Sequence, residues 1–271
     1  MIPTFQNKAE LFEYLRLNKD LLIRQKRMEF KKADAVMFLP VEEGEEIAVK
    51  SVGEAGTDPT ELMVKAVINT TNIMDSHDDV HISGLWKKSL SENKNILHLQ
   101  EHEMKFDKLI SDEVNAYTKM IPWKSLGFDF EGNTQALVFE STVKAADNGY
   151  MFDQYRKGRV KNHSVGMQYV KIQMAVNSKD KYFAEEKAAW DKYLPEIVNR
   201  QVAEDKGYFF AVTEAKVIEG SAVLIGSNRA TPTISVSEAA AEKGTPHEHT
   251  EPPVGTQIDW NTILTSLKQT K

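Results

Sequence analysis

Residues 208–225 read YFFAVTEAKVIEGSAVLI, a long stretch in which aromatic and β-branched residues are frequent and which therefore predicts a strand. Shorter stretches of the same kind occur at residues 35–41, 62–68, 96–99, 109–120, 135–143 and 163–176. Single helices are predicted between them, at residues 85–91, 150–157 and 182–200. Because strand and helix do not alternate strictly, the pattern favours an α+β domain over a doubly wound fold. The expected sheet is antiparallel or mixed and can close into a barrel.

The composition is that of an ordinary globular protein, with 41% hydrophobic and 27% charged residues among 271. A formal net charge of −6 argues against general nucleic-acid binding. The chain has no cysteine, which excludes disulfides, a thiolate nucleophile and cysteine-bound metal. No run of eighteen apolar residues occurs, and the first residues, MIPTFQNK, lack the features of a signal peptide. We therefore expect a cytosolic protein without membrane or nucleic-acid partners.

The two ends of the chain differ in composition from its middle. Residues 1–34 include a predicted helix at 8–32 with more basic than acidic side chains. This excess indicates a solvated helix face or, alternatively, a docking helix for an acidic partner. Residues 35–232 form the predicted main domain. Residues 233–271 have the composition of a linker and end in a short predicted helix at 258–267, which either docks on a partner or folds back.

Histidine is scarce, with seven in the chain, yet two pairs are spaced by four residues: His77 with His81, and His98 with His102. The second pair lies in HLQEH, which matches the H-x-x-E-H pattern of inverted zinc peptidases. On a helix such a pair shares one face and can bind one ion. On a strand the two residues are about 13 Å apart. Because residues 95–99 look like the start of a strand, a zinc metallohydrolase is the less favoured alternative.

A hydroxyl nucleophile is suggested by Ser164, which lies in a strand-like segment two residues before Gly166. The glycine allows another backbone to approach the serine closely. A serine nucleophile needs a general base, and His102 or His98 is the natural source. His163 is a poor base for its neighbour, because adjacent strand residues point to opposite faces.

Four segments together resemble one family. They are residues 75–90, DSHDDVHISGLWKKSL; residues 96–103, ILHLQEHE; residues 158–167, GRVKNHSVGM; and residues 217–230, VIEGSAVLIGSNRA. In this order they resemble motifs of the prohead maturation serine proteases of tailed phages, which are related to the herpesvirus assemblins. The resemblance covers roughly residues 62–232. Departures are an apparent insertion at about residues 180–205, Met167 where an aromatic residue is common, and Gly220 where an aliphatic residue is usual.

The resemblance implies a serine endopeptidase with a mostly antiparallel, barrel-like, herpesvirus-protease-like fold. It places the nucleophile at Ser164, the base at His102 and the third catalytic residue at Glu219. Glu101, Glu103 or a second histidine remain alternatives for the third position. No metal or cofactor is implied.

The same resemblance implies the partners and the compartment. The substrates would be the major capsid protein, the scaffold protein and the protease's own ends, cleaved inside an assembling procapsid in the host cytoplasm. Herpesvirus relatives are activated by dimerisation, so a homodimer is compatible with this interpretation. The competing hypothesis is a noncatalytic scaffold or assembly protein that has a protease-like fold.

Overall fold

The computed structural model describes residues 2–29, 59–93 and 95–238. The strand predicted at 35–41 and the helix predicted at 258–267 lie outside these residues. The described residues belong to one compact unit, which contains every element described below.

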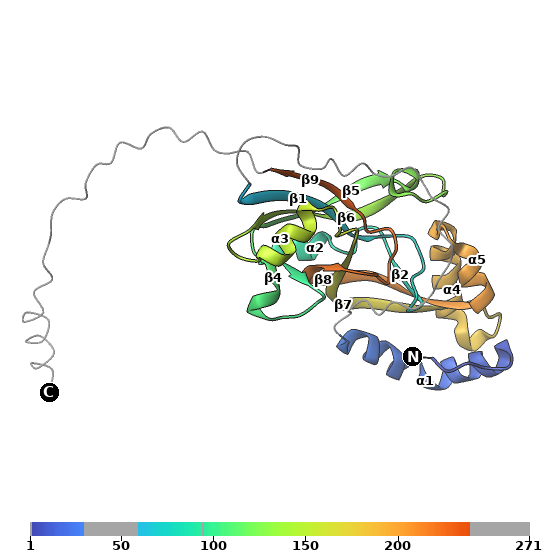
Figure 1. Cartoon of the computed structure of the whole chain (residues 1–271). Coiled ribbons are helices and arrows are strands. Elements are labelled where there is room, and N and C mark those ends of the chain that lie inside the picture. Colours follow the sequence, from blue (N-terminus) through green and yellow to red (C-terminus); the bar gives the residue numbers. More distant parts are fainter. Residues whose placement is uncertain (1, 30–58, 94, 239–271) are drawn as a thin grey trace, which may run out of the picture. The chain divides into compact units, whose positions relative to one another are not determined.

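One of two sheets in this unit is antiparallel throughout and has the strand order β5-β6-β1-β9 (Figure 1). Its strands are β1 (Glu61–Thr70), β5 (Val114–Pro122), β6 (Asn133–Lys144) and β9 (Thr233–Glu238). In β1, residues 62, 64 and 66 are buried and residues 61 and 63 are exposed. This alternation is what a strand with one covered face requires.

The second sheet is built around β8 (Tyr208–Val223). One edge of β8 pairs antiparallel with β7 (Asn162–Val176) along nearly its whole length. The other edge pairs in parallel with two short strands, β2 (Asp79–His81) and β3 (Leu97–Gln100). β4 (Leu109–Ser111) extends the sheet beyond β3.

The predicted α+β class is confirmed, but the predicted barrel is wrong: in the described part of the chain the two sheets do not close. Strand pairing is mostly antiparallel, as predicted; the parallel pairs are the short ones that β2 and β3 form with β8. β2, β3 and β4 are only three or four residues long, and none of them pairs with a described strand of the other sheet. Among the described strands, the outer ones are β2, β4 and β7 in one sheet and β5 and β9 in the other.

Helices cover the ends and the outer side of the β8 sheet. They are α1 (Lys8–Met28), α2 (Lys87–Glu92), α3 (Gly149–Arg156), α4 (Ala184–Tyr193) and α5 (Arg200–Lys206). Short 3₁₀ turns occur at Phe106–Lys108, Trp123–Leu126, Lys181–Phe183 and Leu194–Glu196. The segment identified as an insertion thus folds into α4 and α5, and α4 packs Trp190 against Phe209 of β8.

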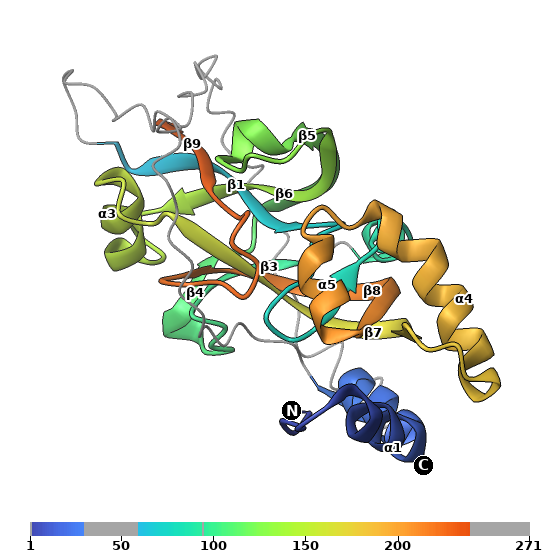
Figure 2. The same ribbon diagram turned by 90° about the vertical axis from the view of Figure 1, so that its right-hand side faces the viewer.

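The basic N-terminal helix is part of the compact unit. It begins at Asn7, whose side-chain oxygen accepts the backbone N–H of Glu10 at 3.0 Å, a typical N-cap. Leu15 and Leu22 are buried in the main hydrophobic core. Figure 2 shows α1 below the β8 sheet, with the β1 sheet on the opposite side. Part of its basic face is therefore used internally, since Lys26 forms a salt bridge with Asp79 of β2.

Between the sheets, the side chains are apolar and closely packed. Ile68 and Phe139 from the β1 sheet face Val165 and Val217 from the β8 sheet. Gly220 lies opposite Phe139, and a β-carbon added there would be 2.4 Å from the Phe139 ring. The position that departs from the family motif is thus a point of close approach between the two sheets.

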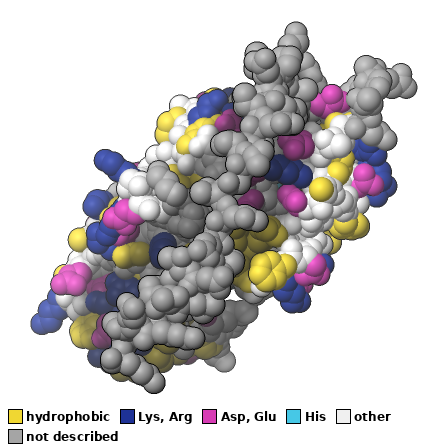
Figure 3. All heavy atoms as spheres, turned by 90° about the vertical axis from the view of Figure 1, so that its left-hand side faces the viewer, with side chains coloured by type: hydrophobic (Ala, Val, Ile, Leu, Met, Phe, Trp, Pro, Cys, Tyr) yellow, Lys and Arg dark blue, Asp and Glu magenta, His cyan; other side chains and the backbone are white. Residues whose placement is uncertain are grey.

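None of the helices within the described residues is long and apolar enough to cross a membrane. On the face shown in Figure 3, acidic and basic side chains of the described residues are interspersed, without a continuous area of one sign.

Candidate active site

Glu219 lies in the middle of the β8 sheet. It pairs with Gly166 of β7 on one side and with Leu97 of β3 on the other, and its side chain is fully buried. A carboxylate in such a position is stable only if hydrogen bonds satisfy its oxygens. Both oxygens have a partner: Oε1 is 2.6 Å from Nδ1 of His102, and Oε2 accepts the hydroxyl of Ser221 at 2.6 Å.

A tight turn after β3 brings His102 to this carboxylate. Glu101 and His102 both have left-handed backbone conformations, with φ values of 52° and 57°. For non-glycine residues this conformation costs on the order of 1–3 kcal/mol and occurs mainly at functional sites. Two hydrogen bonds hold the turn: the Glu101 N–H donates to the Ala222 carbonyl at 3.0 Å, and the His102 N–H donates to Ser221 Oγ at 3.1 Å.

The pairing determines which ring nitrogen of His102 carries the proton. A carboxylate only accepts hydrogen bonds, so Nδ1 of His102 is the donor to Glu219. Nε2 is then the nitrogen that can accept a proton, which is the tautomer that a general base requires. The imidazole is 3% exposed, so the pair lies in a region from which water is largely excluded.

Ser164 is placed beside this pair by the register of β7 and β8. Its Cα partner is Ser221, so the two serine side chains lie on the same face of the sheet. Opposite Cα atoms in such a ladder are about 4.5–5.5 Å apart. Ser221 therefore has Ser164 on one side and the His102 backbone on the other.

The Ser164 hydroxyl is not hydrogen-bonded to His102. It makes no hydrogen bond to any residue that the structure describes, and the residue is 6% exposed. The structure therefore joins two of the three predicted catalytic residues directly and places the third on the neighbouring strand. Catalytic hydrogen bonds are often long in the absence of substrate.

The other candidates for the third position do not contact the imidazole of His102 in this way. Glu101 is exposed on the turn, and Glu103 pairs with Lys105 at 2.5 Å. Sequence reasoning assigned no role to Ser221, although it is two residues from Glu219 and therefore on the same face of a strand. The two-residue spacing from Glu219 is the feature of the sequence that could have identified Ser221.

A second buried polar cluster lies on the opposite face of the β8 sheet. The Tyr155 hydroxyl is 2.9 Å from Nε2 of His98 and 2.9 Å from Nε2 of His163. Nδ1 of His98 is 3.0 Å from Ser141 Oγ, and Nδ1 of His163 is 3.3 Å from the Thr231 carbonyl. Burial lowers the pKa of His98 to about 3 and the pKa of His163 to about 4. Both imidazoles are thus neutral at neutral pH.

The carbonyl of Thr231 can only accept, which fixes the direction of the hydrogen bonds in this cluster. His163 donates from Nδ1 and accepts the Tyr155 hydroxyl at Nε2. His98 then donates from Nε2 to the Tyr155 oxygen and accepts the Ser141 hydroxyl at Nδ1. The cluster links the strand that carries Ser164 to the strand that precedes the His102 turn.

The arrangement does not support the zinc interpretation. His98 and His102 project to opposite faces of the β8 sheet, and both ring nitrogens of His98 are already engaged. Nδ1 of His81 is 3.0 Å from the Asn69 amide nitrogen, and Nε2 is 2.9 Å from the Tyr169 oxygen. Within the described residues there is no group of three or more histidine, aspartate or glutamate side chains that could hold a metal ion.

Comparison of the chain with protein-family models, with curated proteins and with solved structures finds no match.

Proposed function

We propose that the protein is a serine endopeptidase, with Ser164 as nucleophile, His102 as general base and Glu219 as the residue that orients and stabilises the imidazole. The observation that carries this proposal is the buried hydrogen bond of 2.6 Å between His102 Nδ1 and Glu219 Oε1. It selects the tautomer in which Nε2 accepts a proton, on the sheet face where Ser164 lies.

In this mechanism the Ser164 oxygen attacks a peptide carbonyl while its proton passes to Nε2 of His102. The buried charge of Glu219 stabilises the imidazolium, and the hydroxyl of Ser221 keeps the carboxylate in place. The proton is then transferred to the leaving amine, and an acyl-serine remains. Water, deprotonated by His102, hydrolyses this ester and regenerates the serine.

The proposed substrates follow from the family resemblance of the four sequence segments. They are the capsid and scaffold proteins of an assembling phage procapsid, together with the ends of this chain. A noncatalytic assembly protein is the second candidate, favoured by the missing hydrogen bond between Ser164 and His102.

The test is co-expression of the wild-type chain or Ser164→Ala with the capsid and scaffold proteins encoded in the same genome, followed by intact-mass analysis. We expect trimmed chains with the wild type and full-length chains with the alanine variant. Identical uncut masses in assembled shells would favour the assembly protein. Equal cutting by both variants would exclude Ser164 as the nucleophile.

A further inference from the structure

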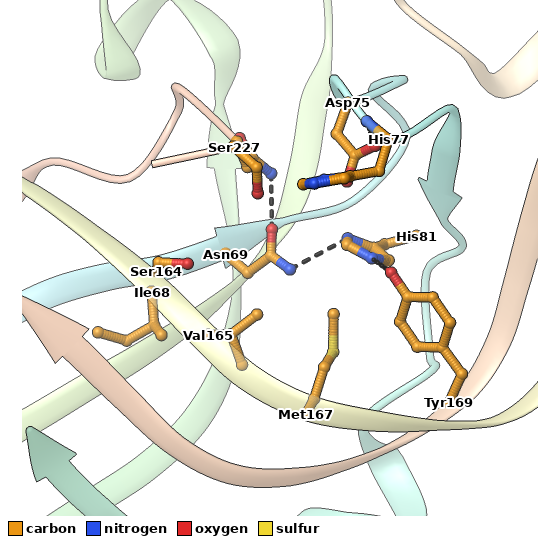
Figure 4. Close-up of a pocket in the computed structure, with 11 residues that line it drawn as sticks. Ile68, Asn69, Asp75, His77, His81, Ser164, Val165, Met167, Tyr169 and Ser227 are labelled. Atoms are coloured by element: carbon orange, nitrogen blue, oxygen red, sulfur yellow. Dashed lines mark hydrogen bonds between the residues drawn. The ribbon is translucent and has the colours of Figure 1, made fainter. Parts of the chain in front are cut away.

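A pocket lies directly beside Ser164, and its two walls differ in chemistry. Ile68, Val165 and Met167 form an apolar wall, whereas Asp75 and His77 form a polar wall. Figure 4 shows the Ser164 hydroxyl pointing into the pocket, with Asp75 and His77 on the far side. The cavity volume is small, about 20 Å³, and the pocket opens to solvent.

The carboxylate of Asp75 is only partly satisfied by the protein. Its Oδ1 accepts the backbone N–H groups of His77 at 2.8 Å and Asp79 at 3.0 Å. Its Oδ2 accepts no hydrogen bond from the residues that the structure describes. One oxygen therefore fixes the loop, and the other remains available to a ligand.

Lys26, whose charge acts on Asp75, is committed to a different carboxylate. Lys26 forms its salt bridge with Asp79 and also donates to the His77 carbonyl at 2.9 Å. The Tyr169 hydroxyl donates to the other oxygen of Asp79 at 2.9 Å. Burial and the charge of Asp79 raise the pKa of Asp75 to about 7, and Lys26 offsets this only in part.

His81, which also lines the pocket, contacts Asn69 and Tyr169. The side-chain oxygen of Asn69 accepts hydrogen bonds from Thr70 and Asn228, so its amide nitrogen is the group that faces His81. Nδ1 of His81 is then an acceptor, and Nε2 donates to Tyr169.

We propose that this pocket binds the side chain of the substrate residue whose carbonyl Ser164 attacks, and that this residue is lysine. The four methylene groups lie along the apolar wall, and the ammonium donates to Oδ2 of Asp75. This inference rests on the proposed peptidase function. It assigns the pocket the role of selecting basic cleavage sites.

The experiment compares two synthetic peptides that differ only in lysine or norleucine at the residue before the scissile bond, taken from a cut site found with the wild-type protein. We expect the wild type to prefer lysine. Asp75→Asn keeps an acceptor for the two backbone N–H groups but removes the charge. It should lower kcat/KM for the lysine peptide by about 10–100-fold, the loss of one charge-assisted hydrogen bond, and leave the norleucine peptide unchanged.

Asp107→Asn is the matched control, because Asp107 is an exposed acid in the segment after His102 and should not alter the preference. Equal losses for both peptides in Asp75→Asn would make Asp75 a structural residue and overturn the proposal. Wild-type cleavage only after neutral or acidic residues would overturn it while leaving the peptidase function intact. If wild type and Ser164→Ala both cut nothing, the peptidase function fails, and the pocket assignment fails with it.

Discussion

At the scale of single residues, Glu219 is the side chain on which the proposed chemistry depends most. Replacing it by glutamine keeps the size but removes the charge that would stabilise the imidazolium. We expect Glu219→Gln to lower kcat by roughly 10³–10⁴-fold, by analogy with the loss of a buried triad carboxylate. Peptide cleavage measures this directly. Glu101→Gln and Glu103→Gln serve as controls and should retain activity; a comparable loss in either would move the third catalytic role to that residue.

The cluster of His98, Tyr155 and His163 makes the stability of the fold sensitive to acid. In the native state the pKa values of the two histidines are lowered to about 3 and 4 from an ordinary value of 6.5. Between pH 6.5 and 5 the unfolded chain therefore binds up to two more protons than the native protein. Because the unfolded state binds more protons there, the free energy of unfolding rises with pH.

We expect the contribution of these two groups to be complete above pH 6.5 and to be lost progressively as the pH falls. Over that interval the slope should approach ~2.7 kcal/mol per pH unit from the two groups together. Urea unfolding at several pH values measures the slope, and NMR shows whether the two imidazoles titrate in the native protein. Native titration of both rings near pH 6.5 would contradict the expectation.

At the scale of elements, the long strands and the short strand β3 were predictable from local composition, whereas β2 and β9 were not. The stretches at 163–176 and 208–225 correspond to β7 and β8, because fourteen or more residues of strand-like composition leave little ambiguity. β2 has three residues and pairs with a strand about 130 positions later, so no local pattern marks it. β9 follows Pro232 in a segment that was interpreted as a linker, and it becomes a strand only through its pairing with β1.

The same distinction applies to the candidate site. The strand character of residues 96–99 was predictable and correctly separated His98 from His102. The left-handed conformation of Glu101 and His102 was not predictable, because neither residue is glycine or asparagine. It depends on hydrogen bonds to Ser221 and Ala222, which lie far away in the sequence. His102 and Glu219 are 117 residues apart in the sequence, so no local pattern predicts their contact. Only the order of the four family-like segments suggested it.

At the scale of the whole molecule, the position of the candidate site depends on how closely the two sheets approach each other. Gly220 lies between Glu219 and Ser221 in β8 and faces the β1 sheet. A β-carbon there would lie 2.4 Å from the Phe139 ring and 2.9 Å from Ile68. Phe139 is fully buried, so the added atom must displace the ring or separate the sheets.

Gly220→Ala should therefore lower the free energy of unfolding by about 1–3 kcal/mol through overpacking. The cause can be isolated by combining it with Phe139→Leu, which makes room opposite the new methyl group. If the clash with Phe139 is responsible, the double variant should be more stable than the sum of the single changes predicts, with a coupling of at least about 1 kcal/mol. Urea unfolding of the four proteins gives this value.

Gly149→Ala is the matched control, because nothing lies within 4 Å of the position of its added β-carbon. It sits at the start of α3, where alanine favours the helix, so stability should be unchanged or slightly higher. Additive effects of Gly220→Ala and Phe139→Leu would show that the sheets tolerate the methyl group without contact with Phe139. A coupling of at least about 1 kcal/mol would instead mean that the close approach of the sheets at Gly220 holds the β8 backbone in place. Because this backbone carries both Glu219 and Ser221, the same approach would hold the geometry of the site.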